Sequence, residues 1–394
     1  MNFDVVIVGA SSSGLYAAEL LVNAGKRVGV FERQQEINPE RRTYIITPQI
    51  KEFLSEIPEE AELCLTKAMA VEACDASVYI TFHDPDLIIE RKLLTKALLS
   101  RAISAGAEIF TGYQFIGFEC KSKQTKLVFR SSDDEILATT SVVIGADGLK
   151  SQVALAAGMA LPPSVPIIQA EIKLPSGWNS SVTKVWFDVD DTPYFYWLIP
   201  ESSDRGVLGL VGQDTKQTRS LLERFLHKLE LQALRYQASQ VAMHHPTFRP
   251  WGEIGDLPIY LIGDAAAQVK VTTVGGTVTG FWGARAAVQA ILRGTSYARE
   301  LRSLKRELDL HWVIRFFLEH LDNRGYADLV RYISPSVCQF LGQRNRDQMA
   351  GAFWQLPFHE PRLLFLGLKI LLKISLSRFG KLWHHALIKP ESGD

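Results

Sequence analysis

Gly263 and Asp264 directly follow a short apolar run at 259–262, and two further glycines, Gly275 and Gly276, precede an alanine-rich helical pattern. The apolar run predicts a buried strand, and open α/β sheets bind ligands at the carboxyl ends of strands, so Asp264 would face a ligand. Glycine lacks a Cβ, so the backbone can approach a flat ligand closely. The N-terminal N–H groups of the following helix favour negative charge. This stretch therefore favours a flat, electron-rich ring whose reduced form is an anion, although a glycine pair before a helix can also be only a turn.

A second ligand-binding pattern lies at the start of the chain. The apolar run 3–8 predicts a strand buried on both faces, and Gly9 and Gly14 follow it before a helical pattern. The next predicted strand, 27–31, ends at Glu32. This order of elements is a dinucleotide-binding fingerprint: a strand, a glycine-rich turn, a helix and a second strand, with an acid roughly 20 residues beyond the turn. In that motif the helix N-terminus holds a pyrophosphate, and Glu32 would accept a hydrogen bond from an adenosine ribose hydroxyl.

Serine and arginine side chains near this turn could add contacts to phosphate oxygens. Ser11 stands at the second glycine position of the motif, and Ser11, Ser12 and Ser13 offer hydroxyl donors. Arg33 follows the ribose-binding acid, and Arg91 lies near the start of a predicted helix. Arginine forms strong hydrogen bonds with phosphate. We predict that both arginines contact the nucleotide, and a solvated loop is the alternative for Arg33.

A further apolar run, 141–144, ends in the Gly-Ala-Asp-Gly sequence of residues 145–148, which contains Asp147. Together with the N-terminal fingerprint, this constellation resembles the flavoprotein hydroxylase superfamily. In that superfamily the stretch that matches 145–148 lies near the FAD cofactor, and the stretch that matches Gly263 and Asp264 binds the ribityl chain. The resemblance therefore implies FAD as the cofactor.

Within the superfamily, residues 263–276 are most similar to geranylgeranyl reductases. The matching positions are Gly263, Asp264, Ala265, Ala266, Gln268, Val269, Lys270, Thr272, Thr273, Gly275 and Gly276. Ala267, Val271 and Val274 depart from the reductase pattern, because they stand where glycine, proline and glycine are usual. A β-branched residue such as Val274 restricts the backbone. Reductases of this kind often carry a cysteine in the loop after the ribose-binding acid, but residues 34–44 contain none.

Strand-like runs separated by turn signals in the middle of the chain predict an antiparallel sheet. Strand-like runs lie at 166–172, 182–189, 194–199 and 205–211, with turn signals between them. Period-two alternation would place Phe195, Trp197 and Ile199 on one large apolar face. We predict that this face lines the substrate pocket, and the alternative is that it only packs the sheet against a helix. A similar stretch lines the isoprenoid pocket of geranylgeranyl reductases, and flavin-dependent halogenases carry one in a comparable place.

The end of the chain predicts a basic amphipathic helix. The bases of residues 362–389 are Arg362, Lys369, Lys373, Arg378, Lys381 and Lys389, and this segment contains no acid. At about 100° per residue, Arg362, Lys369 and Lys373 share a face opposite Leu364 and Leu371. Such a helix either lies in a membrane interface or packs on the protein with a solvated basic face. We leave both interpretations open.

Composition and charge exclude several other classes of protein. The chain has 394 residues, a formal net charge of zero and 47% hydrophobic residues, which is typical of a folded protein without bias toward nucleic acid. Its four cysteines show no metal-binding spacing, so we expect no metal site. No signal peptide and no spanning apolar run are visible in the sequence. We expect a cytoplasmic protein, peripheral at the inner face of a membrane if the basic helix binds lipid.

The predicted fold class is α/β. It combines a Rossmann-like FAD-binding domain of the flavoprotein hydroxylase type with an inserted antiparallel β-sheet substrate domain and a helical C-terminus. The FAD-binding domain would comprise residues 1–75, 90–160 and 250–295, the substrate domain 76–89 and 161–249, and the helical region 296–394.

The resemblance implies an FAD-dependent oxidoreductase. We predict that it reduces double bonds of a geranylgeranyl-type isoprenoid chain by hydride transfer from N5 of the reduced flavin. A second nucleotide fingerprint is not visible in the sequence, so NAD(P)H or another electron donor would bind transiently. The sequence identifies no side chain as the proton donor, and the catalytic residues stay unknown. The alternatives are an FAD-dependent monooxygenase acting on a lipid, quinone or aromatic compound, and a non-catalytic flavin- or lipid-binding protein at a membrane.

Overall fold

The apolar run at the start of the chain forms β1 (Val5–Val8), an inner strand of a six-stranded sheet. In the computed structural model, which describes residues 1–120 and 125–387 but not the side chains of 375–387, the strand order is β16-β17-β10-β1-β2-β6. The other strands are β2 (Val28–Glu32), β6 (Glu108–Thr111), β10 (Val142–Gly145), β16 (Trp251–Ile254) and β17 (Leu257–Leu261). Neighbours are parallel except for β16 and β17. The carboxyl ends of β1, β2, β10 and β17 therefore meet at one edge, where such sheets bind ligands.

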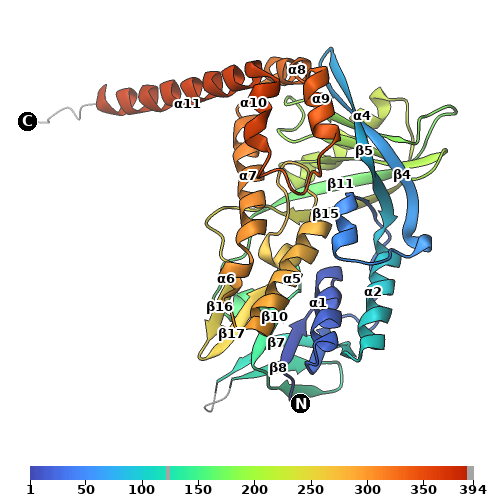
Figure 1. Cartoon of the computed structure of the whole chain (residues 1–394), viewed down its shortest axis with the longest axis vertical. Helices are drawn as coiled ribbons and strands as arrows, with labels where there is room; N and C mark the ends of the chain where they lie inside the picture. Colours follow the sequence, from blue (N-terminus) through green and yellow to red (C-terminus); the bar gives the residue numbers. More distant parts are fainter. Residues whose placement is uncertain (121–124, 388–394) are drawn as a thin grey trace, which may run out of the picture.

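Both faces of this sheet are covered. Val5 and Ile7 join a core with the helices α1 (Ser12–Asn23), α2 (Arg91–Ala105) and α5 (Thr277–Arg293). These helices are labelled in Figure 1. Val6 and Val8 point the other way and join a second core with a three-stranded sheet. That sheet contains β7 (Gln114–Glu119), β8 (Lys126–Arg130) and β9 (Glu135–Ala138), and the short helix α3 (Gln152–Ala156) packs beside it. The prediction of a strand buried on both faces is confirmed.

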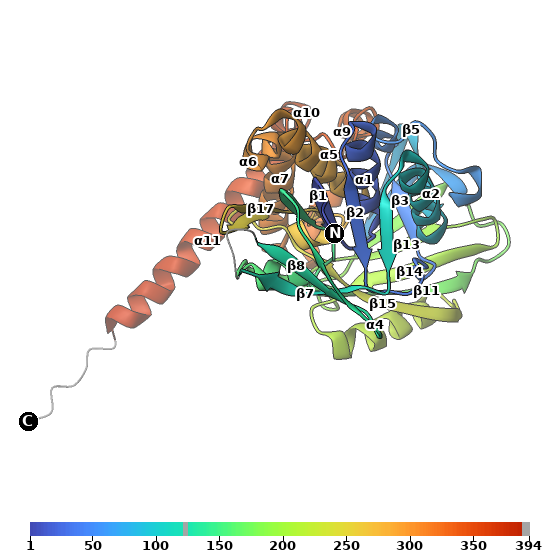
Figure 2. The same ribbon diagram turned by 90° about the horizontal axis from the view of Figure 1, so that it is seen from below.

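The second large sheet has eight strands in the order β15-β11-β14-β13-β12-β4-β5-β3. They are β3 (Thr43–Ile46), β4 (Glu62–Ala73), β5 (Ala76–Glu90), β11 (Ser164–Lys173), β12 (Val182–Phe187), β13 (Tyr196–Pro200), β14 (Arg205–Val211) and β15 (Ala233–Ala242). Neighbours are antiparallel except for β4 and β12. Helix α4 (Thr215–Lys228) covers one face of this sheet (Figure 2). Tyr196 and Leu198 pack near Leu222 and Phe225 on that face.

The strands β3 and β4 belong to this larger sheet although they precede residue 76, where we placed the first segment of the substrate domain. The reason is the long β4–β5 hairpin, which pairs Ala73 with Ala76 at its tip and Glu62 with Ile89 at its base. The division of the chain into domains stays a prediction. The pairings show that 43–90 contributes mainly to the eight-stranded sheet.

Helices form most of the chain after residue 296. They are α6 (Tyr297–Glu300), α7 (Arg302–Leu318), α8 (Asn323–Arg331), α9 (Pro335–Gly342), α10 (Leu356–His359) and α11 (Pro361–Leu387). Short 3₁₀ turns lie at η1 (Pro48–Glu52), η2 (Glu59–Ala61), η3 (Gly263–Ala266) and η4 (Phe353–Gln355). Helix α11 extends away from the rest of the molecule (Figures 1 and 2). Among the described residues, no helix is both long and apolar enough to cross a membrane. The predicted fold class, including the helical C-terminus, is confirmed.

Candidate active site

The turn between β1 and α1 is closed by two glycines. Gly9 has φ +97°, and a Cβ on it would lie 2.6 Å from the carbonyl oxygen of Ala146. A Cβ on Gly14 would lie 2.5 Å from the carbonyl oxygen of Gly9. Real Cβ atoms do not approach backbone so closely. The turn therefore requires glycine at both positions, and it leaves the N-terminus of α1 at the ligand-binding edge of the sheet.

Glu32 ends β2 beside this turn. Its two carboxylate oxygens accept hydrogen bonds from the backbone N–H groups of Ala10, at 2.9 Å, and Gln34, at 3.0 Å. The side chain is partly exposed. The carboxylate is thus held at the sheet edge next to the glycine turn, and it keeps further acceptor capacity for a ligand hydroxyl.

The three predicted serines differ in their surroundings. Ser11 is exposed, and its hydroxyl accepts a hydrogen bond from the N–H of Gly14 at 3.2 Å, so it caps α1. Ser12 is partly exposed and shares a hydrogen bond with Thr95 at 3.2 Å. Ser13 is buried, and its hydroxyl would lie 2.6 Å from a Cβ on Gly280 of α5. Ser11 is therefore the serine best placed at the open turn, whereas Ser13 packs between α1 and α5.

Asp264 is the second residue of η3, shortly after β17, and its side chain is exposed. Protein atoms nevertheless surround it closely enough for desolvation to raise its pKa, and the charges of Arg91 and Arg42 act to lower it. A side chain that is accessible and yet surrounded lines a recess rather than an outer surface. The predicted Arg91 is thus near Asp264, together with Arg42, whereas Arg33 lies exposed directly after Glu32.

Asp147 follows β10, and its side chain lies at the N-terminus of helix α3, whose N-cap residue is Ser151. One carboxylate oxygen accepts hydrogen bonds from the N–H groups of Gln152, at 2.6 Å, and Val153, at 3.2 Å. The other oxygen is buried without a hydrogen-bond partner among the described residues. Burial raises the pKa of this carboxyl, while hydrogen bonds act to lower it. The backbone of Asp147 also lies against the turn, since a Cβ on Gly9 would be 2.8 Å from its Cα.

A tight loop connects η3 to helix α5. The N–H of Lys270 donates to the carbonyl of Gly275 at 3.0 Å, and the N–H of Thr273 donates to the carbonyl of Lys270 at 3.2 Å. Val274 has φ +47°, a left-handed conformation that is unfavourable for a β-branched residue. Within α5, which is described throughout, the first turn contains no acid, and the N-cap residue Gly276 has no side chain to cap it. The first N–H groups of α5 therefore remain available to a ligand.

The predicted alternation in β13 is confirmed. Phe195, Trp197 and Ile199 share an apolar cluster on one face of the larger sheet, and Val274 of the loop before α5 packs against this cluster. Tyr196 and Leu198 point to the opposite face, toward α4. The three side chains are nearly buried, with 7–9% exposed. Their use as a substrate pocket stays a prediction, and the structure brings them to the loop with the two glycines.

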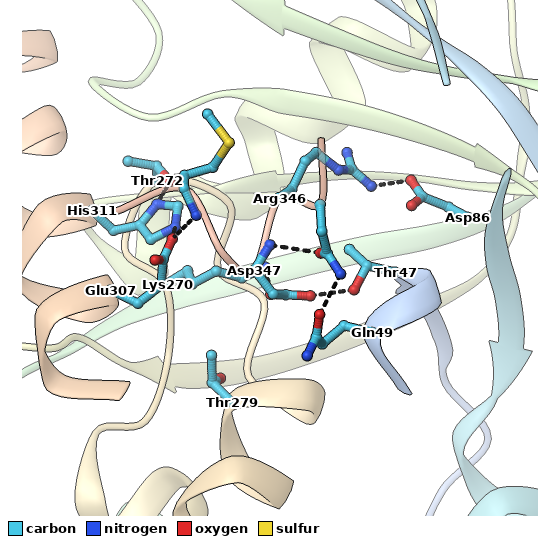
Figure 3. Close-up of polar contacts among 12 residues, drawn as sticks. Thr47, Gln49, Asp86, Lys270, Thr272, Thr279, Glu307, His311, Arg346 and Asp347 are labelled. Carbon is cyan, nitrogen blue, oxygen red and sulfur yellow. Dashed lines mark hydrogen bonds and ion pairs between the residues drawn. The ribbon is translucent and has the colours of Figure 1, made fainter. Parts of the chain in front are cut away.

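A polar cluster next to the same loop was not predicted from the sequence (Figure 3). It depends on the segment 343–352, between α9 and η4. The carboxylate of Asp347 is bonded to the ammonium of Lys270 and to the hydroxyl of Thr47. Asn345 bonds to Gln49, and the neighbouring Arg346 bonds to Asp86 on β5. Asp347 is 77 residues from Lys270, so no local sequence pattern could have joined them.

Helix α7 supplies the remaining part of this cluster. The carboxylate of Glu307 accepts hydrogen bonds from the N–H groups of Met349 and Ala350, each at 2.7 Å. His311, one turn further along, shares a hydrogen bond of 2.5 Å with Thr272 through Nδ1, and its Nε2 lies 3.6 Å from Glu307. Burial lowers the pKa of His311, while Glu307 acts to raise it. The imidazole is therefore neutral near pH 7.

These residues fit a dinucleotide that carries a redox-active ring. The glycine turn, the exposed Ser11 and the start of α1 would hold its pyrophosphate, and Glu32 its adenosine ribose. The recess at Asp264 and Arg91 would hold the connecting chain. The uncapped start of α5, after Gly275 and Gly276, would face the ring. The contacts themselves stay predictions.

Comparison with known families decides the class of the ligand. The family described as FAD binding domain matches residues 2–292. The chain belongs to this FAD-binding family, and it is an FAD-dependent oxidoreductase.

The sequence of the chain is also similar to those of two named enzymes. It is 25% identical over 356 residues to digeranylgeranylglycerophospholipid reductase 1 of Methanopyrus kandleri, which covers 80% of this chain and 94% of the relative. It is 27% identical over 304 residues to geranylgeranyl diphosphate reductase of Rhodobacter capsulatus, which covers 74% and 75%. The predicted resemblance to geranylgeranyl reductases is confirmed.

Solved structures confirm the fold of this flavoprotein. A geranylgeranyl bacteriochlorophyll reductase-like protein from Thermoplasma acidophilum superposes with a TM-score of 0.77 at 18% identity, covering 93% of this chain and 99% of its own. A p-nitrophenol 4-monooxygenase from Pseudomonas putida superposes with a TM-score of 0.66 at 14% identity, covering 86% and 97%. At these identities the similarity concerns the fold alone.

Proposed function

We propose that this chain is an FAD-dependent reductase that saturates double bonds of a geranylgeranyl-type isoprenoid chain. When bound, FAD supplies the hydride for the double bond. The named relatives support this class of substrate, because the two described above carry geranylgeranyl substrates in their names. The assignment of the predicted contact residues to FAD is part of the same proposal.

The observation that carries the proposal is the contact between the aromatic face and the loop before α5. Phe195, Trp197 and Ile199 share one apolar cluster with Val274, which directly precedes the glycines at the start of α5. An apolar chain bound against this face would be desolvated and held beside the ring site. Exclusion of water and fixed orientation both favour hydride transfer over side reactions.

The electron donor is proposed to be NAD(P)H or another reductant that binds transiently. The sequence contains one dinucleotide fingerprint, at Gly9–Glu32, and the resemblance assigns it to FAD. A donor would therefore have to reach the flavin without a second Rossmann site of this kind.

The test is product analysis after a single turnover. The purified FAD-loaded protein is reduced without oxygen and mixed with a geranylgeranyl lipid, and the lipid is analysed by mass spectrometry. Addition of hydrogen to the lipid is expected. Incorporation of oxygen into the lipid when air is admitted would instead identify a monooxygenase. A reduced flavin that neither lipids nor aromatic compounds reoxidise would identify a binding protein.

Two tryptophan variants make this test specific to the proposed pocket. Trp197→Leu removes the indole from the apolar cluster that Val274 packs against, so the yield of reduced lipid should fall at least about tenfold. Trp186→Leu is the matched control, because Trp186 lies opposite Tyr196 and contacts Phe225 on the other face of the sheet. Equal loss in both variants would contradict a pocket at Trp197.

A further inference from the structure

The ion pair between Lys270 and Asp347 is buried. Only 6% of Lys270 and none of Asp347 is exposed. Burial by itself would raise the pKa of Asp347, but the charge of Lys270 and the hydrogen bonds from Lys270 and Thr47 leave it below its ordinary value. The aspartate is thus ionised at neutral pH, and the pair consists of two opposite charges in a poorly solvated place.

The segment that carries Asp347 is held on both sides of this ion pair. Asn345 bonds to Gln49 in η1, and the N–H groups of Met349 and Ala350 donate to Glu307 on α7. These contacts fix the backbone before and after the aspartate. Asp347 therefore cannot move away from Lys270 without breaking several bonds to other elements.

The ion pair lies at the start of α5. The Lys270 ammonium is 3.8 Å from the position that a Cβ on Gly275 would take, and its Cε is 3.4 Å from that position. A backbone hydrogen bond of 3.0 Å joins Lys270 to Gly275. Gly276 is the N-cap of α5. The lysine thus adds a full positive charge to the partial positive charge of the helix N-terminus.

We propose that Lys270 and Asp347 together set the reduction potential of the bound flavin, so that the C-terminal segment 345–350 forms part of the cofactor site. Reduction adds negative charge to the ring system. Lys270 stabilises that charge and Asp347 opposes it, and both act strongly because burial limits screening by solvent. The two are positioning residues for the electrostatics of the site. The proposal requires FAD binding but no particular substrate.

The test is the midpoint potential of the FAD-loaded protein, measured by equilibrium reduction with a reference dye and without substrate. Asp347→Asn leaves the lysine charge uncompensated, so the potential should become more positive. Lys270→Met leaves the aspartate, so it should become more negative. Each change is expected to be about tenfold in the equilibrium constant for two-electron reduction, which is ~30 mV.

Neutral and conservative variants separate charge from packing. Asn345→Ala loosens the same segment without changing its charge, and Lys270→Arg keeps the positive charge, so both should retain the wild-type potential. Shifts of the same sign in Asp347→Asn and Lys270→Met, or a shift in Asn345→Ala as large as in Asp347→Asn, would overturn the proposal. If Lys270→Met is recovered without FAD, the proposal is judged by comparing the midpoint potentials of Asp347→Asn and Asn345→Ala. An unchanged potential in Asp347→Asn would overturn the inference, whereas the expected shifts in a protein that reduces no geranylgeranyl lipid would count against the proposed substrate only.

A different observation, on α11, carries a second inference. Leu364, Phe365, Leu368 and Leu372 are 52%, 68%, 47% and 65% exposed, although Ile370 on the same helix is 5% exposed. The exposed apolar side chains follow one face of the helix, and the helix extends away from the rest of the molecule (Figures 1 and 2). The side chains of Leu364, Phe365, Leu368 and Leu372 are therefore open to contact with another surface.

Basic side chains lie beside this apolar face. Lys369 and Lys373 are exposed, and Arg362 at the start of the helix is exposed and paired with Glu360. Arg378 and Lys381, which we predicted to extend the basic face, lie beyond the described side chains, and Lys389 lies outside the described residues. Exposed aromatic residues, Trp354 at 72% and Phe358 at 87%, precede the helix.

We propose that the exposed face of α11 binds the surface of an anionic lipid bilayer. Apolar side chains would enter the boundary between headgroups and acyl chains, and the lysines would contact anionic headgroups. A second copy of this chain is the less favourable occupant, because it would bring two basic helices together. The inference is independent of the flavin chemistry.

Sedimentation with lipid vesicles tests this inference on the full chain. Vesicles of phosphatidylcholine with phosphatidylglycerol should bind the protein at least about tenfold more tightly than phosphatidylcholine alone, with loss of binding at high salt. The triple change Leu364→Gln, Phe365→Gln and Leu368→Gln should abolish binding. The matched control is Ile103→Gln, Leu155→Gln and Leu234→Gln, at apolar side chains exposed elsewhere by 53%, 51% and 60%. Binding that survives the first change, or a dimer that the first change dissolves in the absence of lipid, would overturn the proposal.

Discussion

Trp197 on β13 lies directly opposite Gly209 on β14, and its ring occupies the space that a side chain on residue 209 would fill. A Cβ on Gly209 would be 2.3 Å from Cζ2 of Trp197 and 2.7 Å from the carbonyl oxygen of Ile168. The glycine therefore determines where the indole lies on the apolar face. Because that face packs against Val274, the position of the indole also affects the space beside the loop before α5.

Gly209→Ala should destabilise the protein by about 1–3 kcal/mol, because the added methyl group forces the Trp197 ring out of its place. Urea denaturation gives the free energy of unfolding. Gly117→Ala serves as the control, since a Cβ there meets nothing within 4 Å. A change of less than about 0.5 kcal/mol in both variants would show that the ring adapts without cost.

Gly9→Ala should weaken FAD binding by at least about tenfold, because the new Cβ would collide with the carbonyl oxygen of Ala146 at the turn between β1 and α1. FAD affinity is measured by fluorescence titration of the deflavinated protein. Gly25→Ala separates the effect of backbone conformation from that of the collision, since Gly25 has φ +78° but open space around its Cβ position. It should lose about 1 kcal/mol of stability and keep its FAD affinity. Similar FAD loss in both variants would contradict the role of the collision.

Val274→Gly should change the free energy of unfolding by less than about 1 kcal/mol. The left-handed conformation at φ +47° costs a β-branched residue ~1–2 kcal/mol, and its relief offsets the loss of apolar contacts with the cluster at Phe195. Val271→Gly offers the contrast, because Val271 is 1% exposed and its φ is not positive. It should cost about 2–4 kcal/mol in thermal or urea unfolding. Equal costs for the two valines would mean that the loop stores no such strain.

Acidification should destabilise the protein through His311. Burial lowers the pKa of His311 below its ordinary value of 6.5, so the unfolded chain takes up a proton before the folded one as pH falls. Stability is then lost progressively below about pH 6.5, by at most ~1.4 kcal/mol per pH unit for one proton. His311→Gln should flatten the profile of unfolding free energy between pH 7 and pH 5.

Two other histidines control for this effect. Burial also lowers the pKa of His244, while Asp309 acts to raise it, so His244→Gln should remove a separate part of the slope. His83→Gln changes an exposed side chain that lies 3.4 Å from Asp84, and its slope is compared with that of His311→Gln. An unchanged slope in His311→Gln would show that this imidazole is protonated to the same extent in both states.

Short-range patterns in the sequence determined much of the candidate cofactor site. Gly9, Gly14 and Glu32 belong to one strand–turn–helix–strand unit, so their spacing alone placed them at one sheet edge. The alternation of Phe195, Trp197 and Ile199 was equally local, because a strand directs every second side chain to the same face. Such features depend on backbone geometry within a few residues, and a single sequence contains that information.

Only the tertiary structure decided which distant segments contact these local units. Ser13 follows Ser11 in the same turn, yet the rotation of α1 buries it against α5. Asp347 lies in an irregular segment without periodicity, and its partners Lys270 and Thr47 are 77 and 300 residues away. Buried charges require a partner, but the chain contains many lysines and aspartates, and their pairing depends on how α7, α9 and the two large sheets pack together. Local spacing therefore predicted the strand–turn–helix unit that we assign to FAD, and long-range packing determined which charges lie beside the loop before α5.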